Sequence, residues 1–190
     1  MAPESRIYLL RHAESAPSPD VPEPEWPLSH DGRTQAEKLV PVLAELPILA
    51  VYSSPFPRAI DTVRPFADRA GLPVNLVEDL RERRLSSGVV PLPQWRAMLK
   101  KAWAEVDWAP PGGESNVQCQ RRMVATLRDL AAAHPGEAVL AASHGNAIAL
   151  FLNSIDPSFG VEEWAALRNP ELFMIHYGGG GPASFERIAL

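Results

Sequence analysis

The stretch Arg-Ile-Tyr-Leu-Leu-Arg-His, residues 6–12, places four apolar side chains directly before a basic residue and a histidine. An apolar run of this length and composition predicts a short buried strand that ends at the arginine. Two other segments have the same layout: residues 48–53 lead into Arg58, and residues 138–143 lead into His144. Because ligands of open parallel sheets bind beyond the carboxyl ends of the strands, these side chains are expected to converge on one pocket.

Helices are expected between the strands, because the apolar residues change to a helical spacing and end signals flank them. Ser29 can cap a helix at its start, Pro57 suits a first helical turn, and Gly71 can end the helix that Pro57 begins. Strands that alternate with helices predict one α/β domain over residues 1–190 with a largely parallel sheet. The expected helices cover residues 30–46, 57–70, 94–106, about 116–133 and 146–153, and the other expected strands cover residues 73–77, 171–177 and 183–189.

The bulk composition argues against several classes of function. A formal net charge of −5 over 190 residues disfavours a nucleic-acid binder, which needs a basic surface. The apolar run at residues 7–10 is far too short for a membrane span or a signal peptide. Cys119 is the only cysteine, so neither a disulfide framework nor a thiolate metal cage can form within one chain. We therefore expect a cytoplasmic protein with no nucleic-acid or membrane partner.

The chemistry expected in the pocket suits a phosphate group. The guanidinium groups of Arg11 and Arg58 can neutralise a dianion and bind its oxygens in bidentate fashion. Arg58 lies in the first turn of its expected helix, where the macrodipole disfavours a cation, and a bound anion would remove that conflict. A neutral His12 can attack phosphorus directly, and two adjacent cations favour its neutral form. His144, close to a helix start, can stabilise charge on the transferring oxygens.

An acid must also protonate the leaving alcohol, and Glu82 is the leading candidate because it precedes an irregular segment. Each residue has a structural interpretation as well. A lone histidine after a strand is more often a satisfied structural residue, Arg58 alone resembles a surface helix residue, and Glu82 lies in a charged run that is usually solvated. The joint arrangement at three strand ends favours the phosphate site over these separate interpretations.

In several sequence blocks the chain resembles the histidine phosphatase superfamily, also called the phosphoglycerate mutase-like family. Residues 9–15 resemble its opening signature, which is usually Arg-His-Gly-Glu-Ser/Thr. The matching blocks appear in family order and cover most of the chain. The other blocks are residues 28–36 (the following helix start), 53–62 (the second arginine), 80–83 (the proton donor), 113–115 (a helix-start marker) and 143–145 (the second histidine).

The resemblance implies a three-layer α/β/α sandwich with a mostly parallel central sheet. It also implies a phosphohistidine at His12 that water hydrolyses, with Arg11, Arg58 and His144 forming the phosphate pocket. Glu82 would act first as the acid and then as the base. Neither a metal ion nor another cofactor is implied, and the partner is a small phosphorylated molecule.

The chain departs from the family pattern at two positions in this region. Ala13 replaces the usual glycine, and Ser18 stands where many members have an asparagine that contacts the phosphate. The serine hydroxyl can still donate one hydrogen bond to a phosphate. Asn146 matches a position that contacts substrate in mutases, and Arg83 is a second possible substrate contact.

A phosphatase is favoured over two alternatives. Mutases generally carry a longer insertion between the acid and the Gly-Glu-Ser block. Here only residues 83–112 separate Glu82 from that block. A non-catalytic phospho-ligand module would need neither a nucleophile nor an acid, yet His12 and Glu82 are both present. Residues 83–111 are expected to form a lid or specificity segment. Whether the protein forms a homodimer is left open by the sequence.

Overall fold

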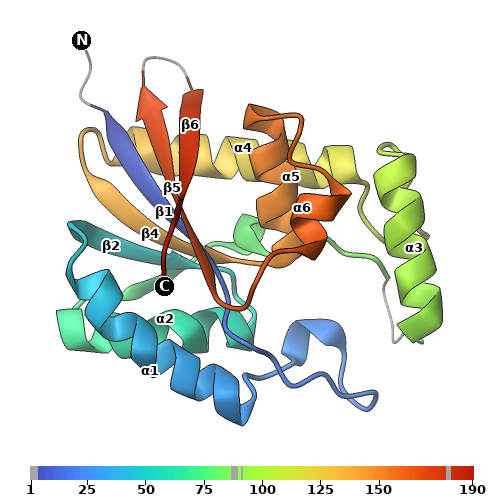
Figure 1. The fold of residues 1–190 in the computed structure, drawn as a ribbon, viewed down its shortest axis with the longest axis horizontal. Helices are drawn as coiled ribbons and strands as arrows, with labels where there is room; N and C mark the ends of the chain where they lie inside the picture. The colour runs from blue at the N-terminus through green and yellow to red at the C-terminus, as the bar shows by residue number, and fades with distance from the viewer. Residues whose placement is uncertain (1–3, 87–89, 91, 179–180) are drawn as a thin grey trace.

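A six-stranded sheet runs through the middle of the computed structural model, which describes residues 4–86, 90, 92–178 and 181–190 (Figure 1). The strand order is β3-β2-β4-β1-β5-β6; β3, β2, β4 and β1 pair in parallel, and β5 and β6 add an antiparallel hairpin beside β1. The predicted mostly parallel sheet is therefore confirmed. The strands are β1 (Ser5–Arg11), β2 (Ile48–Ser53), β3 (Val74–Leu76), β4 (Ala138–Ser143), β5 (Glu171–Gly178) and β6 (Gly181–Ile188).

Helices cover both faces of this sheet (Figure 1). All five predicted helices are present. The short helix α6 and the two 3-10 turns were not predicted, because none spans more than five residues and a helical spacing cannot be recognised over so short a stretch. No helix in the described part of the chain is both long and apolar enough to cross a membrane. The helices are α1 (His30–Ala44), α2 (Pro57–Ala70), α3 (Leu92–Ala104), α4 (Asn116–Ala133), α5 (Gly145–Ile155) and α6 (Val161–Ala165), with 3-10 turns η1 (Glu23–Glu25) and η2 (Glu78–Leu80).

The alternation of side chains along β1 divides the core into two layers. Ile7 and Leu9 pack with the apolar faces of α4 and α5, whereas Tyr8 and Leu10 pack with those of α1 and α2. All six residues of β4 are buried, as expected of a strand covered by helices on both faces. The three-layer α/β/α sandwich is therefore confirmed.

Local sequence signals account for where these helices begin and end. The Ser29 hydroxyl accepts a hydrogen bond from the backbone N–H of Gly32 and caps α1. Ser115 and Gln118 form a reciprocal capping box at the start of α4. Gly71 ends α2 with a left-handed backbone conformation at φ 69°, which a residue with a Cβ rarely adopts.

The register of the three central parallel strands brings their carboxyl ends to one edge. Arg11 at the end of β1 is level with Ser143 at the end of β4. On the other side of β4, Ser53 at the end of β2 is level with Ala142. The residues that follow the strands therefore leave the sheet side by side, and the candidate site lies at this edge.

Candidate active site

Four predicted residues meet at the carboxyl edge of the sheet. His12 follows β1, His144 follows β4, and their ring centroids are 5.1 Å apart. Arg58, from the first turn of α2, donates from its Nε to Nε2 of His12 over 3.2 Å. Arg11, the last residue of β1, acts electrostatically on both histidines. The two histidines and Arg58 are almost completely buried, so the charge of Arg58 acts on the two rings through protein rather than through water.

The His12 ring is held in the form that a nucleophile needs. Its Nδ1 lies 2.6 Å from the carbonyl oxygen of Ala13, which can only accept, so Nδ1 carries the proton. Nε2 is then the unprotonated nitrogen, and its lone pair accepts the hydrogen bond from Arg58. Burial lowers the pKa of His12 to about 3, and the positive charges of Arg58 and Arg11 contribute to this shift. His12 is therefore neutral near pH 7.

Arg58 is already engaged by a carboxylate in this structure. Its Nη2 forms an ion pair with Glu23, and its Nη1 donates to the Glu23 backbone carbonyl over 2.7 Å. Burial raises the pKa of the Glu23 carboxyl, Arg58 opposes that shift, and the nearby Glu82 adds to it. Sequence reasoning missed Glu23, because the proline-rich stretch around it predicts only a stiff loop.

Arg11 lies against the start of α5. Its Nη1 donates to the carbonyl groups of Leu167 and Arg168, while its Nε is buried with no hydrogen-bond partner among the described residues. A Cβ at Gly145 would lie 3.1–3.2 Å from the Arg11 guanidinium group. Glycine at this position therefore lets the arginine pack closely beside the helix.

His144 is completely buried at the point where β4 becomes α5. Its Nε2 lies 2.8 Å from the Ser54 hydroxyl, and the Phe56 ring packs against it with 5.0 Å between centroids. Its Nδ1 has no partner in the described part of the chain. Burial holds the pKa of His144 well below its usual value, and the charge of Arg58 adds to the effect. Ser54 was not predicted, although it lies in the Ser-Ser-Pro segment before Arg58.

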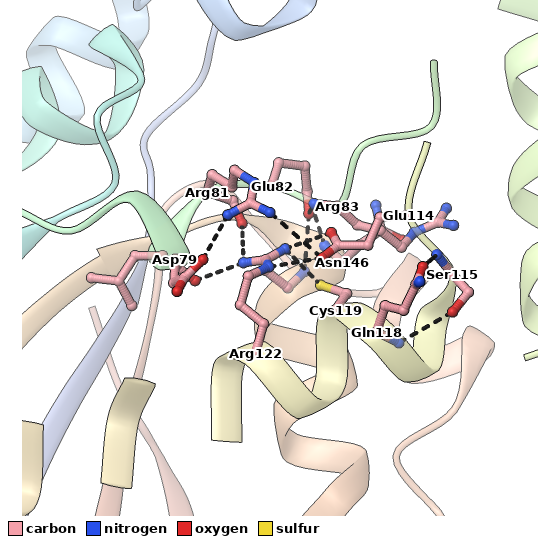
Figure 2. Close-up of polar contacts among 12 residues, drawn as sticks. Asp79, Arg81, Glu82, Arg83, Glu114, Ser115, Gln118, Cys119, Arg122 and Asn146 are labelled. Carbon is pink, nitrogen blue, oxygen red and sulfur yellow. Dashed lines mark hydrogen bonds and ion pairs between the residues drawn. The ribbon is translucent and has the colours of Figure 1, made fainter. Parts of the chain in front are cut away.

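The carboxylate of Glu82 lies against the amino end of α5. Its carboxylate accepts hydrogen bonds from the backbone N–H groups of Arg83, Asn146 and Ala147 at 2.7, 3.1 and 3.0 Å. Figure 2 shows Glu82 within a group of polar side chains that joins its segment to α4. The carboxylate also acts electrostatically on Arg11 and Arg58. Glu82 thus lies beside the cluster of Arg11, His12, Arg58 and His144.

The remaining predicted residues differ in their placement. The Ser18 hydroxyl accepts from the backbone N–H of Asp20 at 3.2 Å, and no hydrogen bond joins it to the four clustered residues within the described ranges. Arg83 is 2% exposed, yet its three guanidinium nitrogens have no partner among the residues that the structure describes. The side-chain oxygen of Asn146 is equally buried and unpaired there. Buried, unpaired polar groups are costly, and a ligand that supplies partners would remove that cost.

No group of three or more histidine, cysteine, aspartate or glutamate side chains is arranged as a metal site in the described part of the chain. Cys119 is buried, and burial raises the pKa of its thiol. It is therefore a protonated thiol and a poor nucleophile.

Comparison with known proteins relates this geometry to a family. The family model of the histidine phosphatase superfamily (branch 1) matches residues 7–187. A glucosyl-3-phosphoglycerate phosphatase of Mycolicibacterium vanbaalenii is 32% identical over 97% of this chain and 84% of its own length. A probable phosphoglycerate mutase of Salmonella typhi is 28% identical over 90% of this chain and 85% of its own length. The solved structure of a mycobacterial glucosyl-3-phosphoglycerate phosphatase matches with a TM-score of 0.77 at 27% identity, covering 97% of each chain.

The burial of neutral His12 predicts a pH-dependent stability. Below its unfolded pKa of about 6.5, the unfolded state binds a proton that the folded state, with a pKa of about 3, does not bind. The free energy of unfolding therefore falls as the pH falls from about 6.5 towards 3. At pH 5 the His12 contribution to this loss is about 2 kcal/mol. His144 acts in the same direction.

Urea unfolding of the wild type and of His12→Gln at pH 7 and pH 5 measures this contribution. The variant is expected to lose about 2 kcal/mol less than the wild type between the two pH values. Equal losses in both proteins would contradict the assignment of a neutral, buried His12.

Proposed function

The chain belongs to the histidine phosphatase superfamily and is a phosphoric monoester hydrolase, and from this membership and the site geometry we propose that His12 is its phosphoryl acceptor. The observation that carries the proposal is the unprotonated Nε2 of His12, which faces the buried Arg58. Its lone pair accepts the hydrogen bond from Arg58 in the ligand-free molecule, and it becomes the attacking pair once Arg58 turns to the oxygens of a bound phosphate dianion. The proposed reaction needs no metal ion.

The phosphoryl group would bind where Arg11, Arg58 and His144 surround the His12 ring. The unpaired Nε of Arg11 and Nδ1 of His144 are the free polar atoms at this place among the described residues. The carboxylate of Glu23 is a negative charge that already lies on Arg58. Phosphate binding to Arg58 therefore requires Glu23 to leave the guanidinium group.

In the first step, Nε2 of His12 attacks phosphorus and the bond from phosphorus to the leaving oxygen breaks. The Glu82 carboxyl group donates its proton to that oxygen, which leaves as an alcohol. The Nδ1 proton stays on the ring, where the Ala13 carbonyl accepts its hydrogen bond and disperses the charge that develops on the ring. Arg11 and Arg58 stabilise the negative charge on the transferring oxygens.

In the second step, a water molecule attacks the phosphohistidine. The Glu82 carboxylate accepts a proton from that water, and the bond from phosphorus to Nε2 breaks. Inorganic phosphate is released and neutral His12 is regenerated. The proton now on Glu82 restores the acid for the next turnover. One carboxyl group thus serves both steps, because the leaving alcohol and the attacking water occupy the same side of the phosphoryl group.

The substrate is proposed to be a small phosphate monoester whose leaving group carries anionic or hydroxyl groups. The Arg83 guanidinium group and the Asn146 side-chain oxygen are buried without hydrogen-bond partners in the described structure, and they would bind such groups. Glucosyl-3-phosphoglycerate, which is named for the mycobacterial relatives, is therefore the first compound to assay. Ser18 remains a proposed phosphate contact, because its hydroxyl accepts a hydrogen bond from Asp20 and can still donate its proton.

Residues 83–111 are proposed to act as a lid or specificity segment within a single domain. Helix α3 in this segment packs on α6 through Trp103 and Trp164, whose ring centroids are 6.4 Å apart. Residues 87–89 and 91 of the segment lie outside the described structure. The cytoplasmic location and a homodimer also remain predictions.

The proposal predicts that His12→Ala abolishes turnover. The variant is expected to hydrolyse p-nitrophenyl phosphate at least about 10³-fold more slowly than the wild type, because the covalent route is lost. Circular dichroism should show that the variant is folded. Activity of the wild type in EDTA should be unchanged, since no step uses a metal ion.

Undiminished turnover by His12→Ala would contradict the nucleophile, and EDTA inactivation that a divalent metal reverses would indicate a metallophosphatase instead. The mutase alternative is tested with 3-phosphoglycerate. A hydrolase releases inorganic phosphate from such esters, whereas formation of 2-phosphoglycerate without phosphate release would show a mutase.

The ion pair between Glu23 and Arg58 predicts that Glu23→Gln binds phosphate more tightly. Removal of the internal carboxylate takes away a competing anion, so the inhibition constant of inorganic phosphate should fall about tenfold, which corresponds to ~1.4 kcal/mol. Glu25→Gln is the matched control, because Glu25 lies in the same turn and is exposed. Weaker phosphate inhibition of Glu23→Gln would show that Glu23 supports Arg58 rather than competing with phosphate.

A further inference from the structure

The segment that carries Glu82 has little regular structure of its own. Residues 81–86 follow the short turn η2 and form neither a helix nor a strand. Proton transfer to a leaving group nevertheless requires the acid to be held within a few tenths of an ångström. Contacts from elsewhere in the fold must therefore fix this segment.

Arg122, from the second turn of α4, binds the backbone just before Glu82 (Figure 2). Its Nη1 donates to the carbonyl oxygen of Asp79 at 2.6 Å and to that of Arg81 at 3.1 Å. The Arg81 carbonyl belongs to the peptide bond that leads directly into Glu82. One guanidinium group thus holds two carbonyl groups on the amino side of the acid.

Glu114 holds Arg122 in this position and binds the backbone on the other side of Glu82. Its carboxylate accepts two hydrogen bonds from Arg122, from Nε at 2.8 Å and from Nη2 at 2.7 Å. Its own backbone N–H donates to the carbonyl of Arg84 at 2.7 Å. A Cβ at the preceding Gly113 would lie 2.8 Å from that same carbonyl, so glycine permits the close approach.

The pair is shielded from water, which distinguishes it from the surface ion pairs of the molecule. The side chains of Arg122 and Glu114 are 8% and 11% exposed, whereas those of Arg128 and Asp129 on the same helix are 61% and 69% exposed. A bidentate, shielded pair constrains its partners far more than an exposed pair does. Neither side chain has a hydrogen bond to Arg11, His12, Arg58 or His144 within the described residues.

We propose that Arg122 and Glu114 form a clamp that positions Glu82 for proton transfer to the leaving group. The clamp fixes the carbonyl groups of Arg81 and Arg84, which lie on either side of the acid, while the start of α5 fixes its carboxylate. Both residues are positioning residues, because they hold the segment of Glu82 and form no hydrogen bond to the clustered histidines among the described residues. This inference rests on the proposed role of Glu82 as the acid.

A clamp of this kind has a consequence that a structural ion pair lacks. Its loss slows the first step, transfer of the phosphoryl group to His12, only for substrates whose leaving oxygen needs a proton. An alkyl phosphate has a poor leaving group and depends on the acid, whereas 2,4-dinitrophenyl phosphate has a good one and does not. The ratio of kcat/KM between these substrates therefore reports on the acid alone, because kcat/KM covers only the steps up to leaving-group departure.

The experiment compares kcat/KM for the two substrates in the wild type, Glu82→Gln, Arg122→Met, Arg122→Lys and Glu114→Gln. Arg122→Met is expected to lose about tenfold or more with the alkyl phosphate and less than about twofold with 2,4-dinitrophenyl phosphate. Arg122→Lys and Glu114→Gln should lie between it and the wild type, because each keeps part of the contact network. The inhibition constant of inorganic phosphate should be unchanged in all three clamp variants.

Leu127→Ala is the control for lost stability, because Leu127 is fully buried on α4 and belongs to the core. Its cavity should reduce stability and leave the ratio between the substrates unchanged. If Arg122→Met does not fold, the ratios of Arg122→Lys and Glu114→Gln decide the question.

Two results would overturn the proposal, and they are distinguishable. If Glu82→Gln shows the substrate dependence but the clamp variants lose activity equally on both substrates, or not at all, the clamp does not position the acid. If Glu82→Gln itself shows no substrate dependence, Glu82 is not the acid. That result would contradict both the role of Glu82 in the proposed mechanism and the clamp that is proposed to position it.

Discussion

The parallel pairing of β1 with β4 is the constraint on which the rest of the site depends. It places Arg11 level with Ser143, so that the next residues, His12 and His144, leave the sheet side by side. The same edge receives α2, whose first turn brings Arg58 to Nε2 of His12. The helices on both faces then bury this group, and burial is what keeps both histidines neutral. A shift of one residue in this register would turn every side chain of β1 to the opposite layer.

Burying cations without an anion is unfavourable, and the ligand-free molecule compensates in different ways at different arginines. Arg58 forms an ion pair with the carboxylate of Glu23, and Arg11 donates hydrogen bonds to two carbonyl groups in the segment before β5. Arg122 forms a complete bidentate pair with Glu114. Arg83 has no partner in the described structure. The arginines with incomplete or displaceable partners are the ones proposed to meet the substrate, and the fully paired one supports the acid.

Much of this arrangement could be predicted from the sequence, because it depends on short-range signals. The strands at residues 48–53 and 138–143 and the helix at residues 57–70 have their predicted bounds, since apolar runs, Pro57 and Gly71 mark their ends. The strand-end rule was enough to expect that His12, Arg58 and His144 lie together. Glu23 and Ser54 were missed, because their roles depend on contacts over 35 and 90 residues that no local pattern records. The bond from Arg122 to the Asp79 carbonyl, over 43 residues, was hidden for the same reason.

The account depends most on a covalent bond between phosphorus and Nε2 of His12. Rapid-quench experiments with a ³²P-labelled phosphate monoester test it directly. The account predicts a label that is stable in alkali and labile in acid, maps to His12, forms and decays at least as fast as turnover, and is absent from His12→Ala. A label on another residue, or turnover of the wild type with no labelled protein at any time, would contradict it.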